Sequence, residues 1–290
     1  MFSGSMVALI TPLKNGGVDY AAIERLVDWH VEQGTEALVP VGTTGESPTI
    51  DVAEHEKIIQ TVVKRAARRI PVIAGAGGNA TAEAIELARF SKDVGADATL
   101  QVTPYYNKPT QEGLYRHFAA IAEAVDLPMV LYNIPSRCVV SLAPETVARL
   151  ARLPQVVAIK EATGSMDQAS EILARCDLTV LSGDDSLTLP LMALGAKGVI
   201  SVVANLVPQD VKRLTDAMLA GRLAAAQAMH RKLFPLCRAM FIETSPIPIK
   251  TAMKWAGLIE SDEKRLPLTA LSPAAAAALE RAMKDYGLLK

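Results

Sequence analysis

The sequence predicts an α/β fold: a (β/α)8 barrel, or TIM barrel, followed by a small C-terminal helical region. Eight short apolar runs rich in β-branched residues recur along the chain, and longer stretches with helical periodicity lie between them. The runs are continuously apolar rather than alternating, which is typical of parallel strands covered on both faces. Near-equal units without a clear dinucleotide fingerprint favour a closed barrel over the alternative, a doubly wound open sheet.

The eight apolar runs are the predicted strands. They begin near Met6, Ala37, Pro71, Asp97, Pro128, Val156, Leu178 and Gly198. Between them, clear amphipathic segments cover residues 19–33, 51–68 and 81–94. Glycines follow the first and third of these segments and act as helix stops. We therefore expect strand and helix to alternate through the eighth unit.

After the eighth run the pattern is helical only. The predicted helices cover residues 222–240, 246–256 and 273–286. This is too much chain for a single closing helix. We therefore predict a catalytic barrel over residues 1–221 and a C-terminal helical region over residues 222–290, used in part for subunit contacts.

The composition is that of an ordinary globular protein. The 290 residues are 50% hydrophobic and carry 30 Lys and Arg against 31 Asp and Glu, a net charge of −1. This balance argues against a nucleic-acid partner, which would require a basic face. No apolar run has the length of a membrane helix, the N-terminus lacks a basic leader region, and the three cysteines form no CxxC pair. We expect a cytoplasmic protein without a membrane partner.

Lys160 is the residue of the sequence that most clearly indicates a chemical role. In a barrel the active site lies at the carboxyl ends of the strands, and Lys160 closes the sixth apolar run. Desolvation there would lower the pKa of the amine and make it a nucleophile that forms a Schiff base with a carbonyl compound. The alternative is an ion pair with Glu161 or Asp184, and spacing alone leaves both interpretations open.

Other polar side chains follow neighbouring runs. Tyr132 ends the fifth run and could shuttle protons or could simply pack as a ring. Thr43 and Thr44 lie in a glycine-flanked turn that could hold a carboxylate or be an ordinary turn. Arg137 could grip a second carboxylate, although exposed arginines are commoner.

Metal and cofactor sites are not indicated. The four histidines show no HxxxH spacing, and neither a GxGxxG nor a GK[ST] motif occurs. Asp184 and Asp185 could bind Mg²⁺, but a solvated loop is the favoured interpretation. We therefore expect no metal and no nucleotide, phosphate or flavin cofactor.

Five motifs together carry a family resemblance. GTTGES, TPYYNKPTQEG, YNIPSR, IKEATG and SGDD follow one another in that order. The chain resembles, over essentially its whole length, the dihydrodipicolinate synthase family, pyruvate-dependent class I lyases related to N-acetylneuraminate lyase. The resemblance implies condensation of pyruvate with L-aspartate 4-semialdehyde, without a cofactor, for lysine and diaminopimelate synthesis.

The resemblance also implies catalytic roles. Lys160 would form the Schiff base with pyruvate, and Tyr132 would be the general acid and base. Tyr132 would form a proton relay with Thr43 and Tyr106. In this family the counterpart of Tyr106 reaches into the neighbouring subunit's site, so the resemblance implies a homotetramer built as a dimer of dimers.

Substrate-binding roles follow in the same way. The resemblance implies that Thr44 holds the pyruvate carboxylate and that Gly183 and Ile200 line the pyruvate pocket. Arg137 would bind the carboxylate of the semialdehyde. The sequence departs from the family pattern just after Arg137, where Cys138 and Val139 replace the usual Thr-Gly.

Many members of the family are inhibited by L-lysine between subunits. The matching positions here are Ser47, Pro48, His55, Asn79, Glu83 and Tyr105. Glu83 would pair with the ammonium of the lysine ligand and His55 would pack against its stem, although Glu83 is also explained as a solvated helix residue. L-lysine inhibition is therefore a hypothesis.

Two other functions compete with this one. A retro-aldol lyase acting on a sugar acid would share the Lys160 chemistry, but Arg137 argues against it. A non-catalytic barrel that binds a keto acid is the other alternative, and the presence together of Lys160, Tyr132, Thr43, Thr44 and Tyr106 argues against it.

Overall fold

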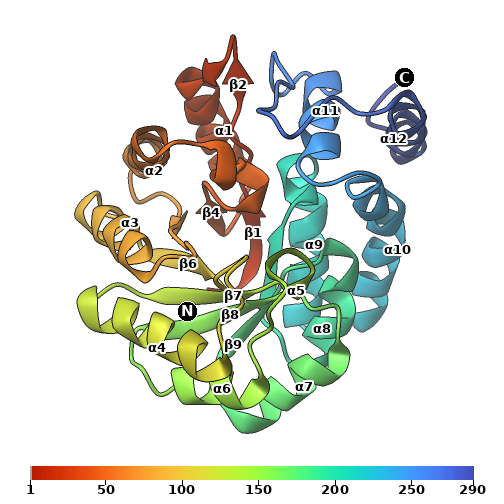
Figure 1. Ribbon diagram of the computed structural model, residues 1–290. Coiled ribbons are helices and arrows are strands. Elements are labelled where there is room, and N and C mark those ends of the chain that lie inside the picture. The colour runs from red at the N-terminus through yellow and green to blue at the C-terminus, as the bar shows by residue number, and fades with distance from the viewer. Residues whose placement is uncertain (1) are drawn as a thin grey trace.

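The computed structural model describes residues 2–290 and forms a closed parallel barrel (Figure 1). Its strands are β1 (Gly4–Ala8), β4 (Ala37–Val39), β5 (Ile73–Gly75), β6 (Ala98–Val102), β7 (Met129–Asn133), β8 (Val156–Glu161), β9 (Thr179–Ser182) and β10 (Gly198–Ser201). They are hydrogen-bonded in the order β4-β1-β10-β9-β8-β7-β6-β5. A parallel bridge between Leu38 and Val72 joins the two ends of this order. The predicted barrel is confirmed, and the open-sheet alternative is wrong.

Helices surround the strands on the outside (Figure 1). They are α1 (Tyr20–Glu32), α2 (Val52–Ala66), α3 (Thr81–Asp93), α4 (Gln111–Ala124), α5 (Pro135–Cys138), α6 (Pro144–Leu150), α7 (Met166–Arg175), α8 (Thr188–Leu194) and α9 (Pro208–Leu219). Side-chain caps fix where α1 and α2 begin. The Asp19 carboxylate accepts a hydrogen bond from the Ala22 N–H, and the Asp51 carboxylate accepts one from the Glu54 N–H. The predicted helical segments therefore agree with the observed ones to within one or two residues at each end.

Alternation along the strands divides the core into an inner and an outer set. Ala158 and Ala162 belong to an apolar cluster inside the barrel, whereas Ile159 belongs to a cluster between the strands and the helices. Lys160 shares the parity of Ala158 and Ala162, so its side chain points into the barrel. The position in the strand, rather than any local motif, thus aims this amine inward.

One element is missing from the sequence-based prediction. A short antiparallel hairpin joins β2 (Leu13–Lys14) to β3 (Gly17–Val18) before α1. Its turn places Asn15 at φ 55° and Gly16 at φ 82°, and an Asn-Gly pair is the usual signal for such a turn. The strands are too short to produce an apolar run.

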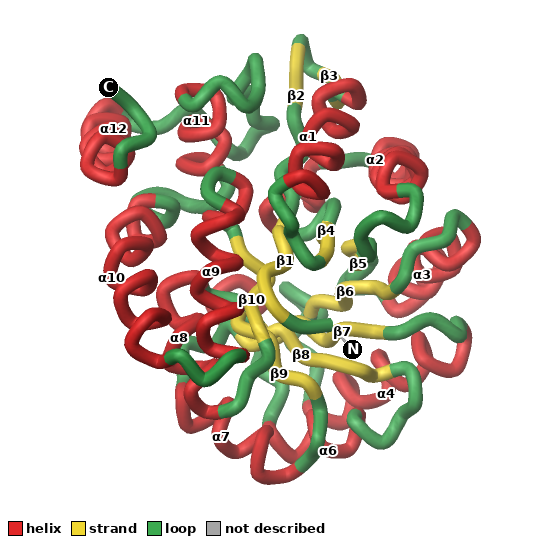
Figure 2. Tube along the Cα trace, turned by 180° about the vertical axis from the view of Figure 1, so that it is seen from behind, coloured by secondary structure: helices red, strands yellow, loops and turns green. Residues whose placement is uncertain are grey.

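Three helices follow the barrel: α10 (Leu223–Ala239), α11 (Ile247–Trp255) and α12 (Pro273–Tyr286). Figure 2 shows them along one side of the barrel, and the loop after α11 lies next to the β2–β3 hairpin, where Lys14 pairs with Glu260. Tyr286 of α12 donates a hydrogen bond of 2.5 Å to Asp210 of α9. The three predicted C-terminal helices are confirmed, while the division at residue 221 stays a prediction. No helix over residues 2–290 is long and apolar enough to cross a membrane.

Candidate active site

Lys160 lies at the carboxyl end of β8 with its side chain buried inside the barrel. The residue is 5% exposed, and burial lowers the pKa of its amine from 10.5 to about 8. The negative charges of Asp184 and Asp185 oppose part of this shift. Within residues 2–290 the amine makes no ion pair, and Glu161 instead accepts hydrogen bonds from Asn133 and from the Thr163 N–H. The ion-pair interpretation is therefore wrong.

Tyr132 on β7 is the direct neighbour of Lys160. The two residues are register partners, and the Lys160 Nζ lies 4.2 Å from the centroid of the Tyr132 ring. Burial raises the pKa of the phenol, and a hydrogen bond with the Thr43 side chain opposes the shift. The phenol therefore stays protonated at neutral pH beside an amine that is partly neutral, so it can donate a proton to a group formed on Lys160.

The turn after β4 carries Thr43 and Thr44. Thr44 is 4% exposed, and Thr43 is half-buried. The Gly45 N–H donates to the Gly42 carbonyl at 3.0 Å, and the Thr11 hydroxyl donates to the Gly45 carbonyl at 2.7 Å. A small cavity is lined by Thr43, Ser47, Gly75, Gly77 and Tyr132, among others. Thr43 and Tyr132 thus face one common space.

The loop after β9 is not the solvated loop that the sequence analysis favoured. Asp185 is 6% exposed and accepts hydrogen bonds of 3.0 Å from the N–H groups of Val202 and Val203. Burial raises the pKa of both Asp184 and Asp185. Two carboxylates therefore lie close enough to attract the Lys160 ammonium. The only sequence signal for this role is the position of the SGDD motif at a strand end.

Gly183 directly follows β9, and Ile200 lies on β10. The Gly183 N–H donates to the Glu161 carbonyl at 2.7 Å, and a Cβ at Gly183 would lie only 2.6 Å from that of Ala162. Only glycine allows this close approach of the β8 and β9 ends. Ile200 is fully buried in the apolar cluster inside the barrel. Both positions thus border the space around the amine.

Arg137 lies at the barrel mouth in α5. Its guanidinium donates hydrogen bonds to the Ser245 carbonyl at 3.2 Å and to the Thr244 hydroxyl at 3.5 Å. Its positive charge contributes to lowering the pKa of both Lys160 and Tyr132. No carboxylate within residues 2–290 pairs with it. Sequence analysis missed the contacts with Thr244 and Ser245, because more than a hundred residues separate them from Arg137.

A second network that the sequence did not reveal orients the loop after Arg137. The Asn133 side-chain oxygen accepts from the Leu142 N–H at 3.0 Å and from the Ser141 hydroxyl at 3.3 Å. Its amide nitrogen donates to Glu161 at 3.2 Å. Asn133 and Glu161 thus tie the end of β7 and the loop after α5 to β8.

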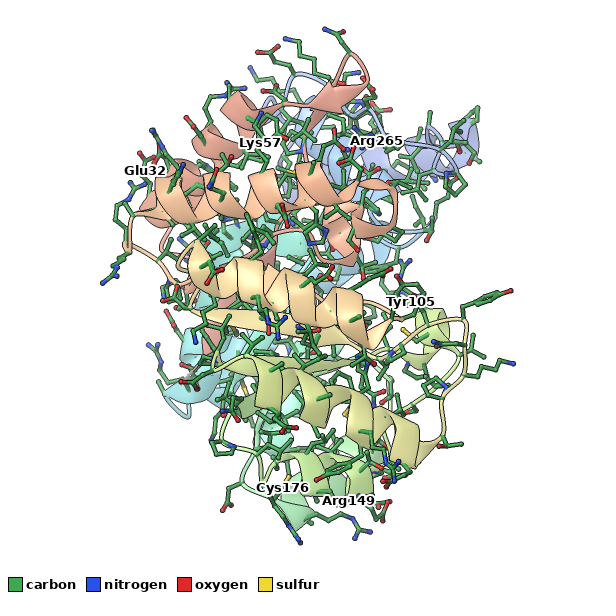
Figure 3. The ribbon with its side chains drawn as sticks, turned by 60° about the vertical axis from the view of Figure 1, so that its left-hand side comes forward. Glu32, Lys57, Tyr105, Arg149, Cys176 and Arg265 are labelled. Carbon is green, nitrogen blue, oxygen red and sulfur yellow. The ribbon has the colours of Figure 1, made fainter. Side chains whose placement is uncertain are left out.

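Tyr106 does not join the other predicted catalytic residues within this chain. Its side chain is 89% exposed, and its backbone has the left-handed φ of 74°. Figure 3 places the preceding residue, Tyr105, at the edge of the molecule, on the loop between β6 and α4. Thr43, Tyr132 and Lys160 are brought together, whereas Tyr106 projects away from the chain.

Contacts link several positions of the candidate L-lysine site to one another or to the small cavity. The Asn79 side chain donates to the Tyr105 carbonyl at 3.3 Å, and the charge of Glu83 adds to burial in raising the pKa of Tyr105. The Nε2–H of His55 donates to the Gly75 carbonyl at 2.6 Å, and burial lowers the pKa of this imidazole. Ser47 lines the same small cavity as Gly75.

The structure holds no obvious alternative centre built on metal ligands. Across residues 2–290, no three His, Cys, Asp or Glu side chains are grouped so that they could hold a metal ion. Cys138, Cys176 and Cys237 are free.

Comparison with known proteins gives full-length matches. The profile of the dihydrodipicolinate synthetase family matches residues 1–286. A 4-hydroxy-tetrahydrodipicolinate synthase from Geobacter sulfurreducens is 55% identical over 291 residues, which cover 100% of both chains. The chloride-inhibited dihydrodipicolinate synthase from Acinetobacter baumannii, complexed with pyruvate, has a TM-score of 0.97 and 47% identity over 100% of both chains. The enzyme from Cyanidioschyzon merolae with lysine bound has a TM-score of 0.96 and 41% identity over 99% of this chain and 99% of its own.

Proposed function

The chain belongs to the dihydrodipicolinate synthetase family and is a lyase of lysine and diaminopimelate biosynthesis that forms 4-hydroxy-tetrahydrodipicolinate, and we propose that it does so through a Schiff base between Lys160 and pyruvate. One observation carries this mechanism. The buried Lys160 amine, which has no ion-pair partner among residues 2–290 and has a pKa of about 8, faces the Tyr132 ring at the barrel mouth.

The chemistry starts with the neutral amine. Lys160 attacks the ketone carbon of pyruvate, and loss of water from the carbinolamine gives an iminium. The iminium draws electrons from the adjacent methyl group, which loses a proton and becomes the carbon of an enamine. That carbon attacks the aldehyde of L-aspartate 4-semialdehyde. The amine of this substrate then attacks the imine carbon, which closes the ring and releases Lys160.

Tyr132 is the proposed carrier of the protons. The first condensation needs an acid to convert the carbinolamine hydroxyl into water, and the later steps need the same group as a base. The contact of the Tyr132 phenol with Thr43 supports a relay toward solvent. We propose that Tyr106 of a neighbouring subunit completes the relay, because the exposed Tyr106 side chain can reach only outside its own chain.

Substrate binding is assigned to the surrounding groups. We propose that Thr44 holds the pyruvate carboxylate and that Gly183 and Ile200 line its pocket. The guanidinium of Arg137, which pairs with no carboxylate in the described part of the chain, would bind the carboxylate of the semialdehyde. This chemistry requires no metal or organic cofactor.

The proposed assembly is a homotetramer, a dimer of dimers, in the cytoplasm. The projecting Tyr106 supports a subunit contact next to the site, since it is 89% exposed and the adjacent Tyr105 is also exposed, at 38%, and neighbouring exposed aromatic rings are typical of an interface. Light scattering after size-exclusion chromatography tests the assembly. A monomeric enzyme with full activity would contradict the role of Tyr106.

L-lysine is the proposed inhibitor at the subunit boundary. The neutral His55, with its Nε2–H given to Gly75, can pack against the aliphatic stem of the ligand. The exposed carboxylate of Glu83 can pair with the ligand ammonium, and Ser47, Asn79 and Tyr105 supply further contacts. A rate that millimolar L-lysine leaves unchanged would contradict this part of the proposal.

Two experiments test the central proposal. Borohydride reduction in the presence of pyruvate should add one pyruvate-derived group, which peptide mapping places on Lys160, and Lys160→Ala should abolish it while the protein stays folded. A paired assay then offers L-aspartate 4-semialdehyde or N-acetylmannosamine with pyruvate. We expect activity only with the semialdehyde. Activity only with the sugar would assign the Lys160 chemistry to a sugar-acid lyase instead.

A further inference from the structure

Glu46, in the same turn as Thr43 and Thr44, is paired with a lysine from the C-terminal helical region. The Lys250 Nζ donates to Glu46 Oε1 at 2.5 Å, and both side chains are 0% exposed. The other carboxylate oxygen, Oε2, accepts the backbone N–H of Arg265 at 3.1 Å. We propose that the Glu46–Lys250 pair positions the Thr43–Thr44 turn for pyruvate binding and proton transfer. This inference rests on the proposed function.

The backbone at Glu46 shows why the turn needs an anchor. Glu46 has φ 59° and ψ 32°, and it separates two short 3₁₀ turns, Thr43–Gly45 and Ser47–Thr49. This left-handed conformation is unfavourable for a residue with a Cβ. The Glu46 N–H donates to the Thr43 carbonyl at 3.1 Å, so the position of Glu46 is transmitted directly to Thr43. With both carboxylate oxygens occupied, Glu46 is held in the one arrangement that aims the two threonines at the site.

Stability alone does not account for a pair of this kind. The desolvation of two buried charges offsets much of their attraction, so a well-packed apolar pair of similar volume is often equally stable. Unlike an apolar pair, the ion pair fixes the orientation of the Glu46 side chain, because the hydrogen bonds to its two carboxylate oxygens have a defined geometry. We therefore infer that the pair serves to place the Thr43–Thr44 turn rather than to increase the free energy of unfolding of the protein.

The pair also separates the roles of the two buried lysines. Lys160 and Lys250 are 5% and 0% exposed, and burial lowers the pKa of both amines. Lys250 donates to a carboxylate, whereas Lys160 has no such partner in the part of the chain that the structure describes. A lysine locked against Glu46 lacks both the free lone pair and the space to attack pyruvate, so we assign Lys250 to positioning.

A neighbouring ion pair supplies a matched control. The Arg265 guanidinium donates to Glu54 on α2 at 2.7 Å and to the Thr49 carbonyl at 2.9 Å. Figure 3 shows Arg265 near one end of α2. This contact joins the same two parts of the chain, but its side chains are 23% and 22% exposed, and it uses the Arg265 guanidinium rather than the backbone N–H that Glu46 accepts. Glu54→Gln thus weakens the docking of the C-terminal region while the Glu46–Lys250 pair at the Thr43–Thr44 turn stays in place.

The test compares Lys250→Met, the double variant Glu46→Gln/Lys250→Met, and the control Glu54→Gln, each in the full chain. We measure the thermal midpoint, kcat, the KM for pyruvate, and the pyruvate dependence of borohydride trapping at Lys160. Lys250→Met should lower the thermal midpoint because it leaves the buried Glu46 carboxylate without its cation. The double variant should recover the wild-type thermal midpoint. Both should lose on the order of 10²-fold in kcat/KM for pyruvate, since small misplacements of catalytic groups have effects of this size. Glu54→Gln should keep the wild-type kinetics.

Two outcomes would overturn the inference. One is a double variant that regains the wild-type kcat/KM together with its thermal midpoint, and the other is an equal kinetic loss in Glu54→Gln. If the methionine variants do not fold, the isosteric Glu46→Gln decides, with a raised KM for pyruvate expected and an unchanged one contradicting the inference. Failure of the proposed function is distinguishable, because wild-type protein would then give no adduct at Lys160.

Discussion

The Lys160 amine nitrogen lies 4.2 Å from the centroid of the Tyr132 ring, and the two residues are direct partners in adjacent parallel strands. Their backbones are fixed by the barrel, so the proposed nucleophile and the proposed acid keep one relative placement without a mobile loop. The electron-rich face of the ring favours the ammonium, while burial disfavours it more strongly. The result is an amine with a pKa of about 8, which is partly neutral near physiological pH.

The rate of adduct formation should follow the neutral fraction of Lys160. With a pKa of about 8, the single-turnover rate of pyruvate adduct formation should rise with pH and level off above about pH 8. Rapid-quench borohydride trapping between pH 6 and pH 10 measures this profile. A midpoint near the ordinary lysine pKa of 10.5 would show that the amine is not desolvated in solution.

Asp184→Asn should move that profile to lower pH. Asp184 attracts the Lys160 ammonium, so its neutralisation removes a contribution that raises the pKa. The midpoint should fall by roughly half a unit or more, with faster trapping at low pH. Asp177→Asn is the matched control, because Asp177 is exposed at the opposite end of β9. An unshifted midpoint in Asp184→Asn would remove this carboxylate from the electrostatics of the site.

Tyr132→Phe should retain the adduct and lose turnover. The phenylalanine ring fills the same buried space, so folding and pyruvate binding should persist, while the proton carrier is lost. We expect kcat to fall by about 10²- to 10⁴-fold, the usual range for a general acid and base. Steady-state kinetics and trapping on the same preparation separate the two effects. Near-normal turnover would assign proton transfer to another group.

Lys160→Met should stabilise the fold at neutral pH. The folded-state pKa of Lys160 is lowered, so protonation of the buried amine costs free energy, in full below pH 8. Between pH 8 and pH 10.5 the unfolded chain binds more protons, so the stability of the wild-type protein should rise with pH there. We expect a gain of about 3 kcal/mol for the variant at pH 7, shrinking toward pH 10, from denaturant unfolding at both pH values. A gain that is independent of pH would indicate better packing instead.

Val139→Gly should also stabilise the protein. Val139 ends α5 with φ 65°, a left-handed conformation that is costly for a β-branched side chain, and its side chain is 63% exposed. Glycine removes that strain, so the free energy of unfolding should rise by about 1 kcal/mol. Val140→Gly is the control and should destabilise, because Val140 packs against the apolar clusters without a positive φ. A destabilised Val139→Gly would mean that the isopropyl group makes contacts that outweigh its strain.

The sequence by itself determined the barrel and the family, and it pointed to Lys160 as the proposed nucleophile. Eight apolar runs, each followed by a helical segment, specify a (β/α)8 order, because strands and helices are indicated by hydrophobic patterns among residues that are close in the sequence. The position of Lys160 at the end of a strand was likewise a local signal. The β2–β3 hairpin escaped notice since two-residue strands have no pattern of their own, although Asn15-Gly16 is a turn signal.

Only the tertiary structure decided how Lys160, Tyr132 and their surroundings act together. The contact of Arg137 with Ser245 and the pair of Glu46 with Lys250 join residues more than a hundred positions apart. No sequence pattern encodes such contacts. The sequence analysis favoured a solvated loop at Asp185, but the residue is buried. Its burial likewise depends on the N–H groups of the residues that follow β10. A side chain's pKa and partners are set by the elements that fold around it, and these come together only in the closed barrel.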